Sequence, residues 1–336
     1  MKTKQIICEY QNYIDQPPIQ PKDLFANACE SDTVTVNSWR PIWEKNIRSN
    51  HAKYGPFSDK SVGQLFGQAS MQPVIVAGAG PSLKDNAEEL KNRGDIKLIS
   101  CLHNFHFLED VGCPADYYVT LDAGEVTIEE VYEGGSKTPD EYWAMSKDRT
   151  LLAYMGASPG LLEKWQGKIL FYNAPVPDEP FIKFTESVEL FNCFVSNGGN
   201  VLGACMYIAK AFMGASIVSF IGADFCFSYD KKFHAWDSKY DKSLGNVLRV
   251  KDVFGNSVYT WRSYHNFKGW FEFVTMTVPG LYINCSEGGT LGAYPDGNIR
   301  SLIQMPLKDF CRQMTLYKEI EAQAKDSKVQ EKKLLF

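Results

Sequence analysis

A glycine-rich turn is the feature of this sequence best suited to chemistry. The apolar run Val74–Ala77 leads into Gly-Ala-Gly-Pro-Ser at Gly78–Ser82, and helical spacing follows. Glycines at such a turn can take positive φ and let a ligand approach the backbone, while the amides that begin the next helix attract an anion. We therefore predict that this turn holds a phosphate, with the Ser82 hydroxyl as an added donor.

The turn departs from two standard phosphate-binding loops. Leu83 stands where the third glycine of the dinucleotide fingerprint would fall. No Gly-Lys-Ser/Thr follows, as a P-loop requires. A tight strand-to-helix turn without a ligand is the alternative interpretation, and Ser82 with Asp85 resembles a capping box that would begin the helix.

A second glycine-rich turn, Ser-Asn-Gly-Gly-Asn at Ser196–Asn200, also precedes a helical pattern. Two helix N-termini at the carboxyl edge of one parallel sheet would face a shared crevice, where open α/β folds bind ligands. An ordinary helix cap is the alternative.

Polar side chains that could act in catalysis follow the predicted strands. Asp122 and Asp224 each end a strand, where a carboxylate can hold a ribose hydroxyl, bind Mg²⁺ through water or orient a base, or simply cap a loop. His234 lies on the polar and aromatic loop after Asp224 and could serve as a general base or as a donor to a departing phosphate. It could equally be a loop histidine without a role. Asn104 and its neighbours His103 and His106 could approach a nucleotide base or ribose.

The elements that must position these residues alternate along the chain. Short apolar strands are separated by helical patterns, which predicts an α/β fold with a Rossmann-like, doubly wound and mostly parallel sheet. The predicted strands are 74–77, 97–101, 117–121, 151–154, 169–172, 216–221 and 281–284, and the main predicted helices are 83–92, 200–213, 261–276 and one that begins at Ser158-Pro159.

The pattern also predicts the organisation of the chain. Residues 1–70 are irregular and rich in proline and aromatic residues, which indicates an N-terminal extension with short helices that packs on the core. Residues 71–300 form the predicted nucleotide-binding transferase domain. Residues 301–336 form a C-terminal helical segment, in which 313–333 is rich in lysine and glutamate.

Composition narrows the class of protein. The formal charge of −5 over 336 residues gives no electrostatic footprint for coating nucleic acid. The nine cysteines include no C-x-x-C pair, which argues against a zinc cluster or a disulfide framework and fits a reducing cytoplasm. The most apolar stretch, 201–227, is interrupted by Lys210 and three glycines and indicates a buried helix and strand. We expect a cytoplasmic protein without a membrane span.

The ordered set of motifs resembles one superfamily. After the turn at Gly78–Leu83 come Cys113–Asp116 with Asp122, then Ser196–Gly199, and then Phe220–Asp224 with His234-Ala235; Gly255–Thr260 and Ile283–Gly289 complete the set. Over residues 73 to 300 the chain is similar to the superfamily that groups archaeal 6-hydroxymethylpterin diphosphokinases with bacterial motility accessory factors, which are linked to flagellin glycosylation. It also resembles bacterial sialyltransferases that use CMP-activated sugars, although those have Asn at the position of Ala79.

The resemblance implies roles for individual residues. Asp122, Asp224, His234 and Glu287 would surround the reacting phosphate or sugar. Nucleotide contacts would come from Gly78, Gly80, Pro81, Ser82, Asn104, Ser196, Asn197 and Gly198.

Three functions are open at this point. The first is a glycosyltransferase that moves a sugar from a nucleotide-activated donor to a hydroxyl acceptor, with aromatic residues stacking on sugar or base: Trp236, Tyr240, Trp261, Tyr264 and Trp270. The second is pyrophosphoryl transfer from ATP to a pterin-like alcohol, with Mg²⁺ held by Asp122 and Asp224. The third is a nucleotide-binding module without catalysis. No cofactor besides Mg²⁺ is implied, and the acceptor could be a glycan, a protein, a small alcohol or a modified nucleic-acid base.

Overall fold

The structure, a computed structural model, describes residues 13–15, 21–230, 232–238, 247–293, 302–317 and 320. The predicted C-terminal helical segment is seen as a helix over 307–317 and again at residue 320, and its remaining residues lie outside the described ones. Tyr240 also lies outside them.

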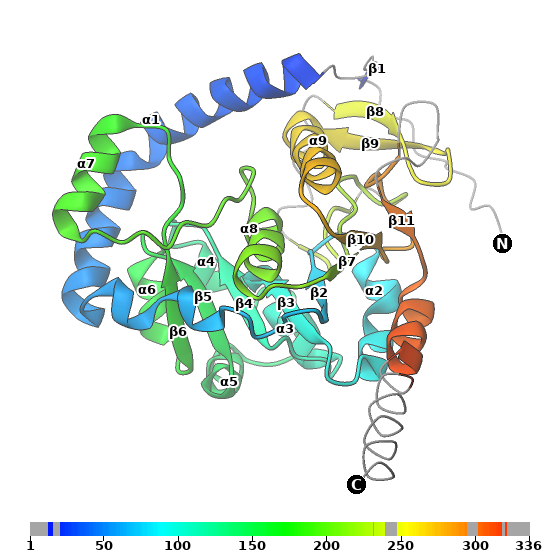
Figure 1. Cartoon of the computed structure of the whole chain (residues 1–336), viewed down its shortest axis with the longest axis horizontal. Coiled ribbons are helices and arrows are strands. Elements are labelled where there is room, and N and C mark those ends of the chain that lie inside the picture. The colour runs from blue at the N-terminus through cyan, green and yellow to red at the C-terminus, as the bar shows by residue number, and fades with distance from the viewer. Residues whose placement is uncertain are drawn as a thin grey trace, which may run out of the picture.

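An eight-stranded, all-parallel sheet forms the centre of the molecule and confirms the predicted α/β fold (Figure 1). All seven predicted strands belong to it, and their apolar side chains are buried because helices cover both faces of a parallel sheet. In spatial order the strands are β11 (Ile303–Gln304), β10 (Leu281–Asn284), β7 (Ile217–Ile221), β2 (Pro73–Ala77), β3 (Lys97–Cys101), β4 (Tyr117–Thr120), β5 (Thr150–Tyr154) and β6 (Lys168–Tyr172).

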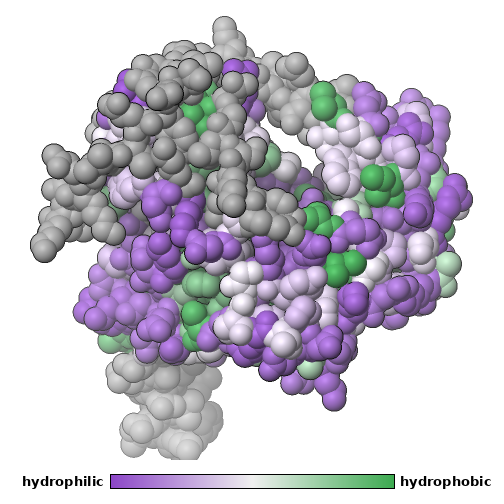
Figure 2. All heavy atoms as spheres, turned by 180° about the vertical axis from the view of Figure 1, so that it is seen from behind, coloured by the Kyte–Doolittle hydropathy of each residue, from purple (hydrophilic) through white to green (hydrophobic). Residues whose placement is uncertain are grey.

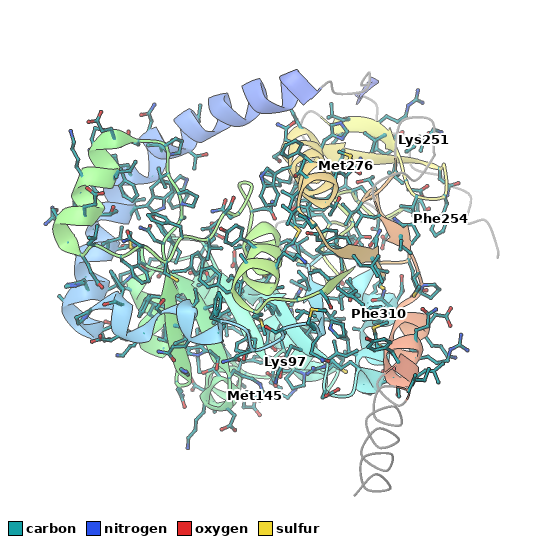
Figure 3. All side chains as sticks on the ribbon, in the orientation of Figure 1. Lys97, Met145, Lys251, Phe254, Met276 and Phe310 are labelled. Carbon is teal, nitrogen blue, oxygen red and sulfur yellow. The ribbon has the colours of Figure 1, made fainter. Side chains whose placement is uncertain are left out.

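The strand order reverses between β2 and β7. From β2 the chain adds β3 to β6 on one side, then returns to place β7 beside β2 and continues outward to β10 and β11. Such a switch point leaves a crevice at the carboxyl ends of the two strands. Lys97, which begins β3, lies low in the view of Figure 3, so the carboxyl edge of the sheet faces upward, toward α8 and α9.

Helices connect the strands much as the sequence predicted. Ser158 caps α6 by accepting the amide hydrogen of Leu161, and Pro159 takes the first helical position. The predicted helix from Asn200 is α8, and one wide turn over Ile208–Phe212 follows it. The connecting helices are α2 (Leu83–Asn86), α3 (Phe105–Asp110), α4 (Thr127–Glu130), α5 (Pro139–Met145), α6 (Pro159–Lys164), α7 (Glu179–Val188), α8 (Val201–Tyr207) and α9 (Arg262–Thr277).

The N-terminal extension differs from the prediction of short helices. Most of its described residues form one helix, α1 (Pro21–Tyr54), which contains Pro41, and two short 3₁₀ turns follow. The internal proline indicated a break, but tertiary contacts override that local preference. The amide of Asn46 donates to the carbonyls of Ala123 (3.0 Å) and Gly156 (3.1 Å), and that of Asn50 donates to two further carbonyls after β5. Figure 1 shows α1 reaching from α6 and α7 across to α9.

A small second sheet lies beside α9 and was not predicted. It consists of β1 (Tyr13–Asp15), β8 (Val247–Lys251) and β9 (Ser257–Trp261), in the order β1-β8-β9. β8 and β9 form an antiparallel hairpin. Buried Asp252 organises its turn by accepting the amide hydrogens of Phe254 (2.9 Å) and Asn256 (2.8 Å).

One apolar core joins α1, the eight-stranded sheet with its helices, and the C-terminal helix, and a separate small cluster of Phe227, Phe233, Val247 and Tyr259 involves the second sheet. Phe310 anchors the helix over 307–317 to this core and lies toward α2 in Figure 3. The face seen in Figure 2 is mostly hydrophilic where it is coloured, with separate apolar groups. Among the helices that the structure describes, none has both the length and the apolar composition of a membrane span.

Candidate functional site

A pocket opens at the switch point between β2 and β7. Its lining includes the first glycine turn and four residues with polar side chains, Asn200, Asp224, His234 and Tyr264. Much of the remaining wall is aromatic. The lining comprises Gly78, Ala79, Gly80, Asn200, Val201, Leu202, Gly222, Ala223, Asp224, Phe225, Cys226, Phe233, His234, Tyr264 and Phe267.

The first glycine turn is shaped by contact with the loop after β7. Neither Gly78 nor Gly80 adopts a positive φ, contrary to the expectation from the sequence. Instead, a Cβ on Gly78 would lie 2.5 Å from the carbonyl oxygen of Gly222, and one on Gly80 would lie 2.6 Å from the same oxygen. The Gly80 amide donates to that oxygen at 2.8 Å. These glycines are therefore required by a close backbone approach within the chain.

The donors of the turn already have an anionic partner. The Oδ2 atom of Asp224 accepts hydrogen bonds from the Ser82 amide (3.0 Å) and the Ser82 hydroxyl (2.9 Å). Ser82 forms no side-chain cap, so the predicted capping box with Asp85 is absent, and α2 is only four residues long. Burial raises the pKa of Asp224 to about 6, and the two hydrogen bonds from Ser82 partly offset this shift.

Asn104 supports the glycine turn from behind. Its side chain is fully buried, and its amide donates to the carbonyl of Gly78 (3.0 Å), to that of Ala77 (3.3 Å) and to the hydroxyl of Ser100 (2.9 Å). Asn104 thus fixes the backbone that lines the pocket and is not itself part of the lining.

The second glycine turn borders the same pocket. Asn200 caps α8 by accepting the Gly203 amide hydrogen at 2.9 Å, and it lines the pocket. Gly198 has a φ of +58°, and a Cβ there would lie 2.2 Å from the Trp270 ring. The side-chain oxygen of Asn197 accepts the Gly199 amide hydrogen at 2.8 Å. The structure therefore brings the two predicted turns together, with Ser196 and Asn197 half-buried beside the lining residues.

His234 reaches the pocket on a loop that crosses the first glycine turn. The Ala235 amide donates to the carbonyl of Ala79 at 3.1 Å and ties the loop to the turn. His234 is buried, with 8% of its surface exposed, and it lines the pocket near Asp224. A histidine held there can take a proton from a hydroxyl or give one to a leaving group.

Asp122 lies apart from the pocket, at the end of β4. Its side chain is exposed, yet desolvation by the surrounding protein raises its pKa. Glu130 on α4 lies close by, and burial, together with the charges of Asp122 and Glu133, raises the pKa of Glu130 to about 8. A Cβ on Gly124 would lie 3.4 Å from the Trp39 ring of α1. These residues form an acidic surface beside α1.

The topology separates the two aspartates that were predicted to hold Mg²⁺. β3 and β2 lie between β4 and β7, so the strand ends that precede Asp122 and Asp224 are roughly 14 Å apart, at three strand spacings of about 4.8 Å. One ion could not be coordinated by both carboxylates. The described residues also bring together no group of three or more side chains able to hold a metal. Mg²⁺ bound by one carboxylate and nucleotide phosphates stays a prediction.

Glu287 and Pro81 do not line the pocket. The carboxylate of Glu287, a residue with φ of +58°, accepts the Leu307 amide hydrogen at 3.1 Å and so holds the start of the C-terminal helix. Its neighbour Gly289 packs directly on the backbone of Asp224. The Glu287 loop thus supports the site, and a direct contact of Glu287 with a ligand stays a prediction.

Sequence reasoning missed part of the aromatic wall. Of the five aromatic residues proposed for stacking, Tyr264 lines the pocket, and Trp270 packs behind the second glycine turn. Phe225, Phe233 and Phe267 also line it. The aromatic spacing after Asp224 and at the start of α9 was the available signal, but it is equally typical of core residues.

The matching family confirms the suspected superfamily. Residues 45–230, more than half of the 336-residue chain, match the sequence model of the family described as 6-hydroxymethylpterin diphosphokinase MptE-like. The chain therefore belongs to this MptE-like family. The matched range includes both glycine turns and Asp224, and it ends at residue 230, inside the loop that carries His234.

A solved structure shares the fold. The MAf glycosyltransferase from Magnetospirillum magneticum AMB-1 superimposes with a TM-score of 0.51 at 16% sequence identity, over 75% of this chain and 38% of the other. This chain thus spans well under half of the length of that protein. No curated protein sequence matches the chain significantly.

Proposed function

We propose that the protein is a glycosyltransferase that moves a sugar from a nucleotide-activated donor to a hydroxyl acceptor. The observation that carries the proposal is the position of His234, which lies in an aromatic pocket at the switch point of the sheet. In this proposal His234 takes the proton of the acceptor hydroxyl or protonates the departing phosphate. The shared fold with the MAf glycosyltransferase supports the same class of reaction.

The size and lining of the pocket support one ring as its occupant. The pocket holds about 150 Å³, a volume in which an apolar cavity binds a single benzene ring. Phe233, Tyr264 and Phe267 offer ring faces for stacking, and Asn200 offers amide hydrogen bonds. We propose that a pyrimidine base or the transferred sugar lies here and that the rest of the donor extends into solvent.

The internal pairing of Ser82 with Asp224 refines the predicted phosphate site. Because Asp224 occupies both donors of Ser82, a phosphate on Ser82 would have to displace this carboxylate or bind while the carboxyl group is protonated. We propose that the donor's phosphate lies instead between the first turn and the backbone of Ser196–Gly198. Gly78 and Gly80 would then contact the donor through their backbone.

Pyrophosphoryl transfer from ATP is the second candidate, and the family match favours it. In that reaction Asp122 or Asp224 would hold Mg²⁺ together with phosphate oxygens. The acceptor would be a small alcohol and not a glycan or protein.

Ligand-dependent thermal stability separates the two candidates. We expect a CMP-, UDP- or GDP-sugar to raise the midpoint of thermal unfolding, because a ligand that binds only the folded state stabilises it. Stabilisation by ATP with Mg²⁺ and by none of the nucleotide sugars would contradict the glycosyltransferase. The matching turnover assay detects the free nucleotide released from each donor with a mixture of acceptor alcohols.

Replacement of His234 tests the catalytic role. We expect His234→Asn to lower turnover about 100-fold or more while donor affinity changes little. Equal losses in turnover and affinity would indicate a binding role.

The cellular compartment also stays a proposal. The seven cysteines whose side chains are described are free thiols, which supports a reducing cytoplasm.

A further inference from the structure

The loop that carries His234 is buried to an unusual degree for a loop. Phe233, His234, Ala235 and Trp236 each expose less than a tenth of their surface, namely 7%, 8%, 6% and 8%. Loops ordinarily run over the surface, so four consecutive buried residues indicate a docked segment.

Trp236 docks the loop into a socket formed by segments after β3 and β4. We call His103, His106, Phe107 and Gly134 the Trp236 socket. The Trp236 ring meets His106 edge to face at 4.6 Å and His103 at 5.0 Å between ring centroids, and it stacks on Phe107 at 5.9 Å. Aromatic pairs at these separations attract one another beyond their burial.

Gly134 provides the back of the socket. Its φ is +84°, and a Cβ there would lie 2.6 Å from Cδ1 of Trp236. Any other residue at this position would have to push the indole outward. The glycine therefore permits the close approach of the ring. Gly134, before α5, thus makes room for Trp236, which lies about 100 residues further along the chain.

The same rings hold the imidazole of His234. Its ring stacks on Trp236 with an interplanar angle of 18° and a centroid distance of 5.2 Å, and it meets His103 at 4.6 Å. Phe233 lies 4.2 Å away on the pocket side. The imidazole is thus enclosed by three rings from two separate parts of the chain, which restricts its orientation.

We propose that Trp236 and His103 are positioning residues that set the orientation of His234 in the pocket, with the Trp236 socket as their support. This inference rests on the proposed function, because it assigns His234 the role of the proton-transferring group. Through this docking, the loop after β7 crosses the turn after β2 and packs on the segment after β3. The shape of the pocket therefore depends on residues that never touch the ligand.

The chemistry of the contacts fits packing better than hydrogen bonding. The indole nitrogen of Trp236 is buried and has no hydrogen-bond partner in the described structure. Burial and the neighbouring His234 and His106 hold the pKa of His103 well below its usual range, so its ring is neutral near pH 7. Indole has no basic nitrogen, and the lowered pKa makes His103 a weak base, so the two rings can confine the imidazole of His234 without taking its proton.

Substitution of Trp236 tests the proposal. We expect Trp236→Leu to lower kcat about 100-fold with little change in donor Kd, because a shift of about 1 Å in a reacting group has that effect. Trp236→Phe should restore most of the rate, since the indole nitrogen contributes no hydrogen bond. Gly134→Ala should also lower kcat, because its methyl group would displace the Trp236 indole from the socket.

Trp165→Phe is the matched control. Trp165 is 5% exposed with an unpartnered indole nitrogen, and it packs on Phe105 and Tyr118 in the core.

A spectroscopic measurement on the free protein keeps the test independent of turnover. The imidazole Cε1–H NMR signal of His234, assigned by its loss in His234→Asn, should shift and broaden in Trp236→Leu and Gly134→Ala and stay unchanged in Trp165→Phe. An unchanged His234 signal in both socket variants, or unchanged kcat in folded Trp236→Leu, would overturn the proposal. If no donor is turned over by the native protein while the signal responds as expected, the proposed function fails and the positioning role stands.

Discussion

Ser82 and Asp224 are joined by two hydrogen bonds to a single carboxylate oxygen, although 142 positions separate them in the sequence. The pair closes the gap between the turns after β2 and β7. In many Rossmann-like proteins the amides at this place hold a ligand's phosphate. Here the chain supplies its own anion, and Gly80 makes room for it, because a Cβ there would lie 2.1 Å from the same oxygen.

The first prediction concerns this pair. Ser82→Ala removes the hydroxyl donor, and we expect the free energy of unfolding to fall by about 1.5–3 kcal/mol at pH 7.5, the usual effect for a hydrogen bond to a charged group. The hydroxyl lowers the pKa of Asp224, which is about 6, so it favours the ionised form. At pH 5 the carboxyl is mostly protonated, and the loss should be smaller. Urea unfolding at both pH values measures the difference.

Ser219→Ala is the control for this substitution. Ser219 is fully buried in β7, and its hydroxyl has no hydrogen-bond partner in the described structure. We expect no pH-dependent loss of stability. An equal loss at pH 5 and pH 7.5 in Ser82→Ala would show that the hydroxyl does not act through the charge of Asp224.

The second prediction concerns Gly80. Gly80→Ala should lower the unfolding free energy by about 1–3 kcal/mol and abolish ligand-dependent stabilisation, because its methyl group must displace the Asp224 carboxylate. Gly94→Ala serves as the control: Gly94 has a φ of +60° but nothing within 4 Å of a Cβ. That variant should lose roughly 1 kcal/mol from backbone strain alone and keep ligand binding. Ligand titrations followed by thermal unfolding distinguish the two.

The third prediction concerns Asn104. Asn104→Ala removes three hydrogen bonds beneath the glycine turn, and we expect a loss of about 2–3 kcal/mol in stability together with weaker donor binding. Asn50→Ala makes a fair comparison, because Asn50 is also buried and its amide donates to the carbonyls of Met155 and Ala157, both at 2.9 Å, away from the pocket. Calorimetric titration should show weaker donor binding in Asn104→Ala alone. Unchanged affinity there would mean that the turn keeps its shape without Asn104.

The fourth prediction concerns the acidic surface beside α1. The pKa of Glu130 is about 8, raised first by burial and then by Asp122 and Glu133. A carboxyl group with a raised pKa binds more protons in the folded state between about pH 4.5 and 8, so stability falls as the pH rises through this window. The quantity to compare is the free energy of unfolding of Glu130→Gln minus that of the native protein. We expect this difference to be larger at pH 8.5 than at pH 5 by on the order of 1–2 kcal/mol. Denaturant unfolding at the two pH values measures this.

An exposed glutamate provides the comparison for Glu130. Glu186 lies on the solvent side of α7. Glu186→Gln should show the same difference from the native protein at both pH values. If Glu130→Gln does the same, Glu130 is ionised near pH 7 in the folded protein and the charge repulsion with Asp122 is weak.

The sheet was predictable from the sequence because its strands are buried on both faces. Val74–Ala77 and Leu281–Asn284 are continuous apolar runs or nearly so, and short helical patterns separate the strands, which leaves few alternatives. The prediction that the two glycine turns face one crevice followed from their places, each directly before a helical pattern. Local signals of this kind do not depend on distant contacts.

The parts that escaped prediction depend on distant contacts. The partner of Ser82 is a carboxylate in the loop after β7, so the local sequence indicated a capping box instead. Pro41 indicated a break in α1, but the helix is unbroken and packs on α6, α7 and α9, and beyond the proline Asn46 and Asn50 anchor it to the loops after β4 and β5. The stacking of Trp236 on His234 joins residues close in sequence, but its support comes from Gly134.

The anchoring of α1 has a practical consequence for dissecting this protein into fragments. The family match begins at residue 45, inside α1, so a recombinant fragment cut at that boundary would keep Asn46 and Asn50 but lose most of the helix that carries them. A helical stub of about ten residues rarely holds its shape in water. The two amides would then leave four carbonyls after β4 and β5 without their donors. The smallest fragment expected to fold therefore begins near the start of α1.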